Sequence, residues 1–155
     1  MINVTIVRHG ETDWNAEGRL QGKIDIELND TGRQQAQECR QALSMVPYDV
    51  IITSSLKRAK MTASLIHHDK KAEFVEMDEF TERFFGDGEG LTFEQREHQF
   101  PNTTAYPNQE LLTDFNKRIM DGLDHIVKHY DHKEIILVTH GAVLNEMFYT
   151  LSNGQ

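Results

Sequence analysis

Residues 7–15 read Val-Arg-His-Gly-Glu-Thr-Asp-Trp-Asn and follow a short apolar run, Ile2–Val7, at the start of the chain. Most residues of that run are β-branched, which favours a buried strand of an α/β sheet with Arg8 and His9 at its carboxyl end. Open α/β sheets bind ligands at this end of their strands. An exposed imidazole beside a fixed cation is suited to nucleophilic attack on an anionic substrate. By itself, this segment is equally consistent with an ordinary strand-to-loop turn.

Two later apolar runs also end in polar residues. Residues 50–52 lead into Thr-Ser-Ser-Leu-Lys-Arg-Ala (53–59), which places Arg58 in the first turn of a helix. Residues 135–138 lead into Thr-His-Gly-Ala (139–142), which places His140 at the same edge of the sheet as Arg8. The irregular stretch 80–90 lies between them and carries carboxylates close to glycines. One of these carboxylates could deliver a proton.

These motifs resemble the histidine phosphatase superfamily, in its phosphoglycerate-mutase-like branch. The resemblance rests on Arg-His-Gly-Glu-Thr (8–12) and on three segments that follow in the family's order. These segments are Leu-Asn-Asp-Thr-Gly-Arg-Gln-Gln-Ala (28–36), Ser-Ser-Leu-Lys-Arg-Ala (54–59) and Thr-His-Gly (139–141). The match covers nearly the whole chain. It implies one domain over residues 1–155, folded as an α/β three-layer sandwich with a mostly parallel central sheet flanked by helices.

The resemblance also implies a set of catalytic residues. His9 would attack phosphorus and become a phosphohistidine, while Arg8, Arg58 and His140 surround the transferring phosphoryl group. Glu82 would protonate the leaving oxygen and later activate water. Phosphoryl transfer depends mainly on positioning and positive charge, and planar guanidinium groups match phosphate oxygens. No metal and no cofactor are expected, because cationic side chains take the place of magnesium.

Four further residues are expected to bind substrate. Asn15, Gln21 and Gly22 match family positions where side-chain amides and a backbone N–H reach the phosphate, and a Gln21 that points at water is the alternative. Arg83 could bind substrate, orient Glu82 or face solvent. These contacts would add to those of the catalytic set.

The chain departs from the family's pattern in three places. Gly88 stands where phosphatase-like members have tryptophan, which removes a packing anchor and predicts a looser loop, so that Glu89 is a second candidate for the acid. Asn145 stands where relatives often have arginine. The sequence stops at Gln155, where relatives continue into a further strand. A compact or truncated member, or a homodimer that covers the exposed sheet edge, would each account for this.

Alternating apolar runs and helical periods predict the order of elements. Strands are predicted over 3–8, 49–53, 73–77 and 134–139, and helices over 30–45, 56–67, 111–130 and from about 142. Asn29 or Asp30 is expected to cap the first of these helices. Right-handed crossovers then place helices on both faces of the sheet. Residues 91–108, a short helix followed by a loop, are expected to form a reduced cap that leaves the site open to water.

Three histidines could in principle form a metal site. His125, His129 and His132 lie four and three residues apart, a spacing that puts side chains on one helix face. The same stretch carries several charged residues and has no partners to orient the imidazoles. We therefore favour a solvated helix end over a transition-metal site.

Composition excludes several classes of protein. The net charge of −9 and a pI of about 5.3 argue against a nucleic-acid partner, because phosphate backbones require a basic face. No apolar run approaches the roughly 18 residues of a membrane span, and the first residues favour a strand over a signal peptide. The single cysteine, Cys39, fits a reducing compartment. We therefore expect a cytoplasmic protein that contacts neither nucleic acid nor membrane.

Taken together, these features predict a histidine acid-type phosphatase, a phosphoric monoester hydrolase that acts on small phosphorylated metabolites. The short cap, and Leu91-Thr92 after a Glu-Gly pair, favour this interpretation over a cofactor-dependent phosphoglycerate mutase, which must exclude water. A non-catalytic phosphate-binding protein of the same fold is a third hypothesis. The presence of all five catalytic residues argues against it.

Overall fold

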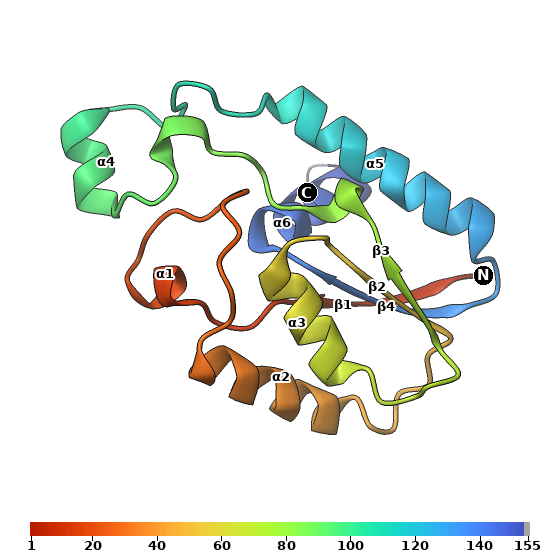
Figure 1. Ribbon diagram of the computed structural model, residues 1–155. Coiled ribbons are helices and arrows are strands. Elements are labelled where there is room, and N and C mark those ends of the chain that lie inside the picture. The colour runs from red at the N-terminus through yellow and green to blue at the C-terminus, as the bar shows by residue number, and fades with distance from the viewer. Residues whose placement is uncertain (154–155) are drawn as a thin grey trace.

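The computed structural model describes residues 1–153 and contains a four-stranded parallel sheet (Figure 1). Its strands run in the order β1-β4-β2-β3. They are β1 (Asn3–Arg8), β2 (Val50–Thr53), β3 (Glu73–Glu76) and β4 (Glu134–Thr139). β1 and β4 match their predicted ranges, whereas β2 begins one residue later and β3 ends one residue earlier than predicted. The expected parallel α/β sheet is confirmed.

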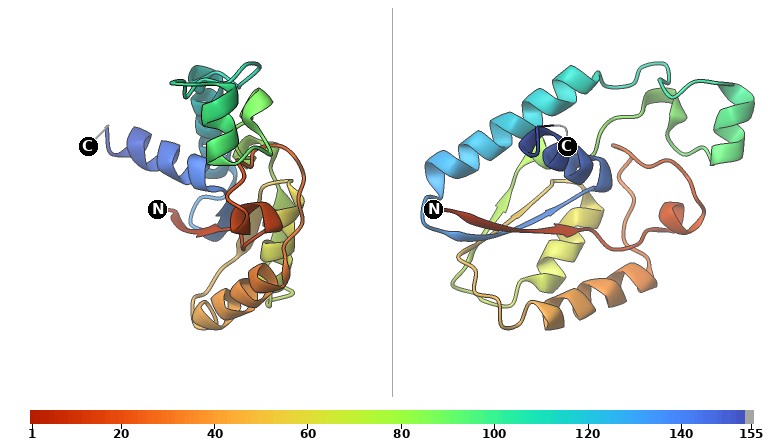
Figure 2. Two further views of the ribbon diagram at one scale, coloured as in Figure 1. Left: turned by 90° about the vertical axis from the view of Figure 1, so that its left-hand side faces the viewer. Right: turned by 180° about the vertical axis from the view of Figure 1, so that it is seen from behind.

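Helices cover both faces of this sheet, as predicted. α3 (Lys57–Ile66) lies on one face together with α2 (Asp30–Ala42), and α6 (Gly141–Leu151) lies on the opposite face with α5 (Leu112–His129), as Figures 1 and 2 show. β4 needs a layer of helices on each face of the sheet, because its alternate residues pack into two different hydrophobic cores. Ile135 and Leu137 pack toward α5 and α6, whereas Ile136 and Val138 pack toward α3. A strand buried on both faces carries the unbroken apolar run seen in the sequence.

Local capping decides where three of the helices begin. The Asn29 side chain accepts a hydrogen bond from Gly32 N (2.8 Å), which confirms Asn29 as the N-cap of α2. α4 (Phe93–Gln99) begins with a capping box between Thr92 and Gln95. A second capping box starts α1 (Asp13–Ala16), which we did not predict because four residues are too few to show a helical period. The 3-10 turns η1 (Asp78–Phe80) and η2 (Gly86–Gly88) were also missed.

The cap segment, residues 91–108, consists of α4 and a loop, in agreement with the predicted pattern. Its Tyr106 corrects the expectation that Gly88 leaves the neighbouring loop without an anchor. A Cβ added to Gly88 would lie 2.5 Å from Cδ2 of the Tyr106 ring. Tyr106 therefore fills the space that a larger residue at position 88 would need, and the loop keeps an aromatic packing partner.

The helices of residues 1–153 include none that combines the length and the apolar character needed to cross a bilayer. α5 is the longest of the described helices, with 18 residues. Its buried side is apolar, whereas ion pairs such as Lys117–Asp121 and Lys128–Asp124 occupy its exposed side. This helix therefore packs on the sheet as an amphipathic helix.

Candidate active site

Two histidines meet at the carboxyl edge of the sheet because their strands are neighbours in register. β1 pairs with β4 so that Arg8 lies opposite Thr139, and the next residue of each strand is a histidine. The rings of His9 and His140 have centroids 5.1 Å apart and an interplanar angle of 55°. Both side chains are buried. The fold thus brings together two imidazoles that are 131 positions apart in the sequence.

The surroundings of His9 leave one ring nitrogen free to react. Nδ1 lies 2.6 Å from the carbonyl oxygen of Gly10, and this contact requires the proton to be on Nδ1. The lone pair is then on Nε2. Burial, assisted by the charges of Arg58 and Arg8, lowers the pKa of His9 to about 3, although the Gly10 contact opposes the shift. His9 is therefore neutral near pH 7, which a nitrogen nucleophile requires.

Thr62 supports this arrangement and was missed in the sequence. Its hydroxyl accepts a hydrogen bond from Gly10 N (3.0 Å) and donates one to the carbonyl of Arg58 (2.7 Å). The peptide that orients His9 is thereby tied to α3. A hydroxyl four residues after Arg58, and so on the same side of the helix, was the signal that could have identified it.

His140 is held by Ser54 at the end of β2. Its Nε2 hydrogen-bonds to Ser54 Oγ (2.7 Å), and that hydroxyl also accepts a bond from Leu56 N (3.2 Å). The Ser54 hydroxyl can donate its proton to Nε2, and in that arrangement the imidazole proton is on Nδ1. Within the described residues, this buried Nδ1 has no hydrogen-bond partner. Burial, with a smaller contribution from Arg58, lowers the pKa of His140 well below its usual value.

Arg58 lies in the first turn of α3, as predicted, and is fully buried. Its Nη2 donates to the Gly22 carbonyl (2.6 Å) and its Nη1 to the Ile24 carbonyl (3.1 Å). Its Nε is buried without a partner among residues 1–153. Burial lowers the pKa of Arg58 to about 10, so that it stays charged at neutral pH. The guanidinium therefore also holds the 22–24 loop, a role we did not predict.

Glu82 and Glu89, the two candidate acids, have different surroundings. Glu82 Oε1 accepts from Arg83 N (3.0 Å), and Oε2 accepts from Ala142 N (3.1 Å) in the first turn of α6. Burial raises the pKa of Glu82, although both N–H groups and Arg58 oppose the shift. A carboxyl with a raised pKa can hold a proton for a leaving group.

The Glu89 carboxylate, by contrast, is hydrogen-bonded to backbone N–H groups of other residues. Its carboxylate accepts hydrogen bonds from Lys23 N (2.7 Å), Ile24 N (3.2 Å) and Phe85 N (3.2 Å). It is absent from the lining of the cavities beside His9. Glu89 is thus placed to join two loops rather than to face a substrate.

Two cavities, of about 300 and 280 Å3, meet at the shared residues Arg8, His9 and Asn15. The first continues to Gly10, Glu11 and Gln35. The second is lined in addition by Arg19, Leu20, Gln21, Glu82, Phe85, Gly141, Ala142 and Asn145. Gln35, Leu20 and Phe85 were not predicted in the sequence: Gln35 reaches the site from α2, and Leu20 and Phe85 reach it from loops whose course no local pattern indicates.

The predicted binding residues divide into two groups. Asn15 and Gln21 line the site, and Gln21 is oriented by Thr12 Oγ1, which donates to its Oε1 (2.5 Å). The Gln21 Nε2 is buried and unpartnered within residues 1–153. Gly22 and Arg83 lie outside the lining of both cavities, as do Arg58 and His140 of the predicted catalytic set.

Gly22 and Arg83 instead have structural contacts. A Cβ at Gly22 would lie 2.5 Å from the Arg83 carbonyl oxygen, so only glycine fits there. Arg83 donates from Nε (3.1 Å) and Nη2 (2.9 Å) to the carbonyl of Glu110. These contacts favour a role for Arg83 in fixing the loop, which differs from the three predicted roles of binding substrate, orienting Glu82 or facing solvent.

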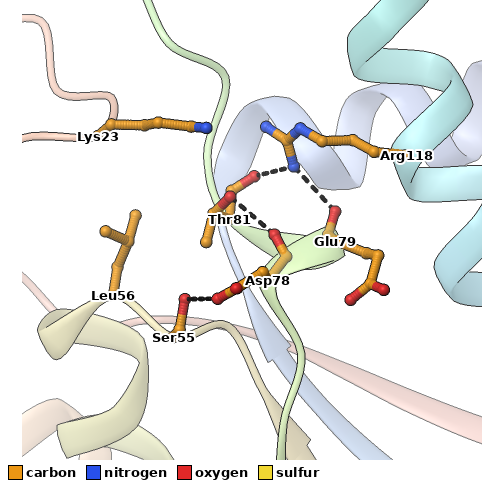
Figure 3. Close-up of a pocket in the computed structure, with 7 residues that line it drawn as sticks. All are labelled: Lys23, Ser55, Leu56, Asp78, Glu79, Thr81 and Arg118. Carbon is orange, nitrogen blue, oxygen red and sulfur yellow. Dashed lines mark hydrogen bonds between the residues drawn. The ribbon is translucent and has the colours of Figure 1, made fainter.

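A larger cavity, of about 510 Å3, lies beside the site and contains neither histidine (Figure 3). Lys23 and Arg118 extend into it from opposite sides, above the carboxylates of Asp78 and Glu79. Its size is no argument for catalysis, because none of the predicted catalytic residues lines it. The chemistry therefore belongs to the smaller cavities at His9.

The histidines at the end of α5 do not form a metal site. The rings of His125 and His129 stack with centroids 3.9 Å apart, and His132 contacts Asp131 (3.2 Å). No group of three histidine, cysteine, aspartate or glutamate side chains within residues 1–153 is placed to hold a metal ion. The contacts agree with an exposed helix end.

Comparison with known proteins links this geometry to phosphatases. A model of the histidine phosphatase superfamily (branch 1) matches residues 4–155. The "uncharacterized phosphatase PhoE" of Bacillus subtilis is 43% identical over 155 residues, which span 100% of this chain and 80% of that protein. YhfR of Bacillus stearothermophilus has a TM-score of 0.89 at 28% identity, with 100% of this chain and 82% of that one covered.

A further solved structure adds a ligand to the comparison. The phosphoserine phosphatase of Entamoeba histolytica, solved in complex with 3-phosphoglyceric acid, has a TM-score of 0.82 at 31% identity. The match covers 99% of this chain and 81% of that one. The comparison of sequences and the comparison of structures therefore both find phosphatases among the similar proteins.

Proposed function

Because the chain belongs to the histidine phosphatase superfamily, branch 1, we propose that it hydrolyses small phosphomonoesters at His9 through a phosphohistidine, the histidine acid-type reaction. The observation that carries this proposal is the pair of histidines at the sheet edge, with Nε2 of a neutral His9 free to attack. Arg8, Asn15 and Glu82 line the same cavity. The proposal treats residues 1–155 as one domain with residues 91–108 as its cap.

The reaction proceeds in two displacements. In the first, the His9 Nε2 lone pair forms a bond to phosphorus while the ester P–O bond breaks, and the leaving oxygen takes a proton from the Glu82 carboxyl. In the second, water attacks the phosphohistidine and gives a proton to the Glu82 carboxylate. The N–P bond breaks, and its electron pair returns to Nε2. Inorganic phosphate leaves and the enzyme is restored.

Buried donors without partners support the binding of a phosphoryl group near His9. His140 Nδ1, Arg58 Nε and Gln21 Nε2 are all buried and unpartnered within the described residues. A buried polar group without a hydrogen bond costs about 1–3 kcal/mol. Phosphoryl oxygens would satisfy these donors, and the positive charges of Arg8 and Arg58 would stabilise charge on the equatorial oxygens in the transition state.

The cap segment favours hydrolysis over phosphoryl transfer back to the substrate. Its helical part, α4, has seven residues, and His9 is reached through two separate cavities. A mutase has to retain its dephosphorylated intermediate and keep water out. A cap of this size is better suited to the entry of water, which the second displacement requires.

Release of phosphate from a panel of esters tests the proposal. Because one similar structure is a phosphoserine phosphatase solved with 3-phosphoglyceric acid, the panel starts with phosphoserine and 3-phosphoglycerate. We expect phosphate release without conversion of 3-phosphoglycerate to 2-phosphoglycerate, even when 2,3-bisphosphoglycerate is added. Such a conversion would indicate a mutase. Tight phosphate binding without turnover of any ester would indicate a non-catalytic binding protein.

Arg58→Lys is expected to lower kcat/KM by about ten- to a thousandfold, because lysine keeps the charge but loses the planar guanidinium. The fold should persist at a lower Tm, since the bonds to the Gly22 and Ile24 carbonyls are lost as well. Lys57→Ala, at an exposed position in the same helix turn, is the control and should leave kcat/KM unchanged. An unchanged kcat/KM for Arg58→Lys would exclude Arg58 as a phosphate ligand.

A further inference from the structure

The backbone that carries Glu82 is held by an arginine from another layer of the fold. Arg118, on α5, donates from Nη1 to the carbonyls of Glu79 (2.8 Å) and Thr81 (2.7 Å), as Figure 3 shows. Its Nη2 donates to the carbonyl of Glu82 itself (2.9 Å). Three carbonyls within four residues are thus satisfied by one guanidinium.

Glu110 completes the connection from the other side. Its carboxylate binds Arg118 in a bidentate manner, at 2.7 Å from Nε and 3.1 Å from Nη2, and also accepts from Phe84 N (3.1 Å). The backbone N–H of Glu110 donates to the Phe84 carbonyl (2.9 Å). The acid segment, which we define as residues 79–84, is therefore tied at both ends to Arg118 and Glu110.

Both side chains of this pair are largely buried, with 19% of Arg118 and 14% of Glu110 exposed. Burial alone would raise the pKa of Glu110, but the bonds from Arg118 and Phe84 N outweigh it and lower the pKa. Glu110 is therefore charged at neutral pH. Arg118 also packs over the Phe115 ring, 4.8 Å from its centroid. A paired charge in such surroundings has a fixed orientation, and loss of one partner is costly.

Among the described residues the acid segment has no strand partner, and besides these contacts a bond from Thr139 Oγ1 to the Phe80 carbonyl (2.7 Å) ties its first part to β4. The segment overlaps the end of η1, at Phe80, and stops before η2 begins at Gly86. Within residues 1–153, the Glu82 carboxyl is bonded only to backbone N–H groups, one of them on the adjacent residue. Its position relative to His9 therefore follows the position of its own backbone.

We propose that Arg118 and Glu110 are positioning residues for the general acid. They hold the acid segment so that the Glu82 carboxyl lies against Ala142 N and faces the cavity at His9. The proposal rests on the proposed function, in which Glu82 protonates the leaving oxygen. A catalytic group displaced by about 1 Å can lose on the order of a hundredfold in rate. Neither residue lines the cavities at His9, so the effect should be limited to steps that need the acid.

Two arginine variants test this with two substrates. Arg118→Met keeps the length of the side chain and its packing on Phe115 but donates no hydrogen bond, whereas Arg118→Lys keeps the charge. Phosphoserine, or another ester that is turned over, has an alkoxide leaving group that needs a proton, and p-nitrophenyl phosphate hardly needs one. We expect Arg118→Met to reduce kcat/KM at least about tenfold more for the alkyl ester. Arg118→Lys should be intermediate.

Two further variants separate positioning from general destabilisation. In a Glu82→Gln background, Arg118→Met should not increase the difference between the substrates, because the acid is already absent. Lys117→Met, at the adjacent exposed position of α5, is the matched control and should change neither substrate. If Arg118→Met fails to fold, Glu110→Gln replaces it, with the same selective loss expected at a smaller size.

A failure of the positioning proposal can be distinguished from a failure of the assignment of Glu82 as the acid. An equal loss on both substrates, or no loss, in folded Arg118→Met or Glu110→Gln would overturn the positioning role while Glu82→Gln still discriminates. If Glu82→Gln itself does not discriminate, the assignment of the acid fails and the positioning proposal fails with it. A selective loss from Arg118→Met that persists undiminished in the Glu82→Gln background would show that Arg118 acts through another group.

Discussion

Replacing His9 with alanine should abolish turnover, with a loss of well over a hundredfold in kcat, while the protein remains folded. The His9 side chain lies at the end of β1 and makes one hydrogen bond, to the neighbouring Gly10 carbonyl. The strand itself is held by its pairing with β4 and by the apolar residues that precede His9. Removal of the imidazole therefore removes the nucleophile without breaking the sheet.

Rapid quenching with phosphorus-labelled substrate checks this directly. The wild-type protein should yield an acid-labile, base-stable phosphoenzyme, as expected for a phosphohistidine, and the His9→Ala variant should yield none. His125→Ala, which removes an exposed imidazole on α5, serves as the control and should be labelled normally. Retention of more than about a hundredth of the activity in His9→Ala would rule out covalent catalysis at this residue.

Glu82→Gln should have the second largest effect, and the effect should depend on the leaving group. Positioned general acids contribute about 10²- to 10⁴-fold, so hydrolysis of an alkyl phosphate should fall by that order. Hydrolysis of p-nitrophenyl phosphate should fall much less, because p-nitrophenolate leaves without a proton. The ratio of the two kcat/KM values, measured on the same preparation, is the quantity that reports on the acid.

Glu89→Gln provides the matched comparison in the same region. Its carboxylate holds the N–H groups of Lys23, Ile24 and Phe85, so we expect a lower Tm and a similar change for both substrates. If both substrates fell equally in Glu82→Gln and diverged in Glu89→Gln, the proton donor would be Glu89. The geometry of the two carboxyls argues for Glu82, since only Glu82 lines the cavity with His9.

Much of the fold could be predicted from local patterns. The apolar runs ending at Arg8, Thr53 and Thr139 are strands, and the helices between them appear where the helical period was seen. Errors were confined to one to three residues at helix and strand ends and to short elements such as α1. Helix ends depend on individual caps, and very short helices lack a detectable period.

The candidate site was predictable to the extent that each residue directly follows a strand or starts a helix. His9, His140 and Arg58 do so, and parallel strands place their carboxyl ends at one edge. The substrate contacts expected for Arg83 and Gly22 stay predictions, and both residues also have contacts within the fold that we did not predict: Arg83 donates to the Glu110 carbonyl, and the Gly22 carbonyl accepts from Arg58. Residues in loops take directions that periodicity does not encode.

By itself, the sequence determined the α/β class, the order of the elements and the motif residues that identify the family. Only the tertiary structure decided which groups hydrogen-bond to the site: Thr62 to Gly10, Ser54 to His140, and Arg118 to the acid segment. These partners are 52, 86 and 36 positions apart. Strand and helix patterns arise from short-range backbone geometry, whereas a hydrogen bond between distant residues depends on how whole layers pack.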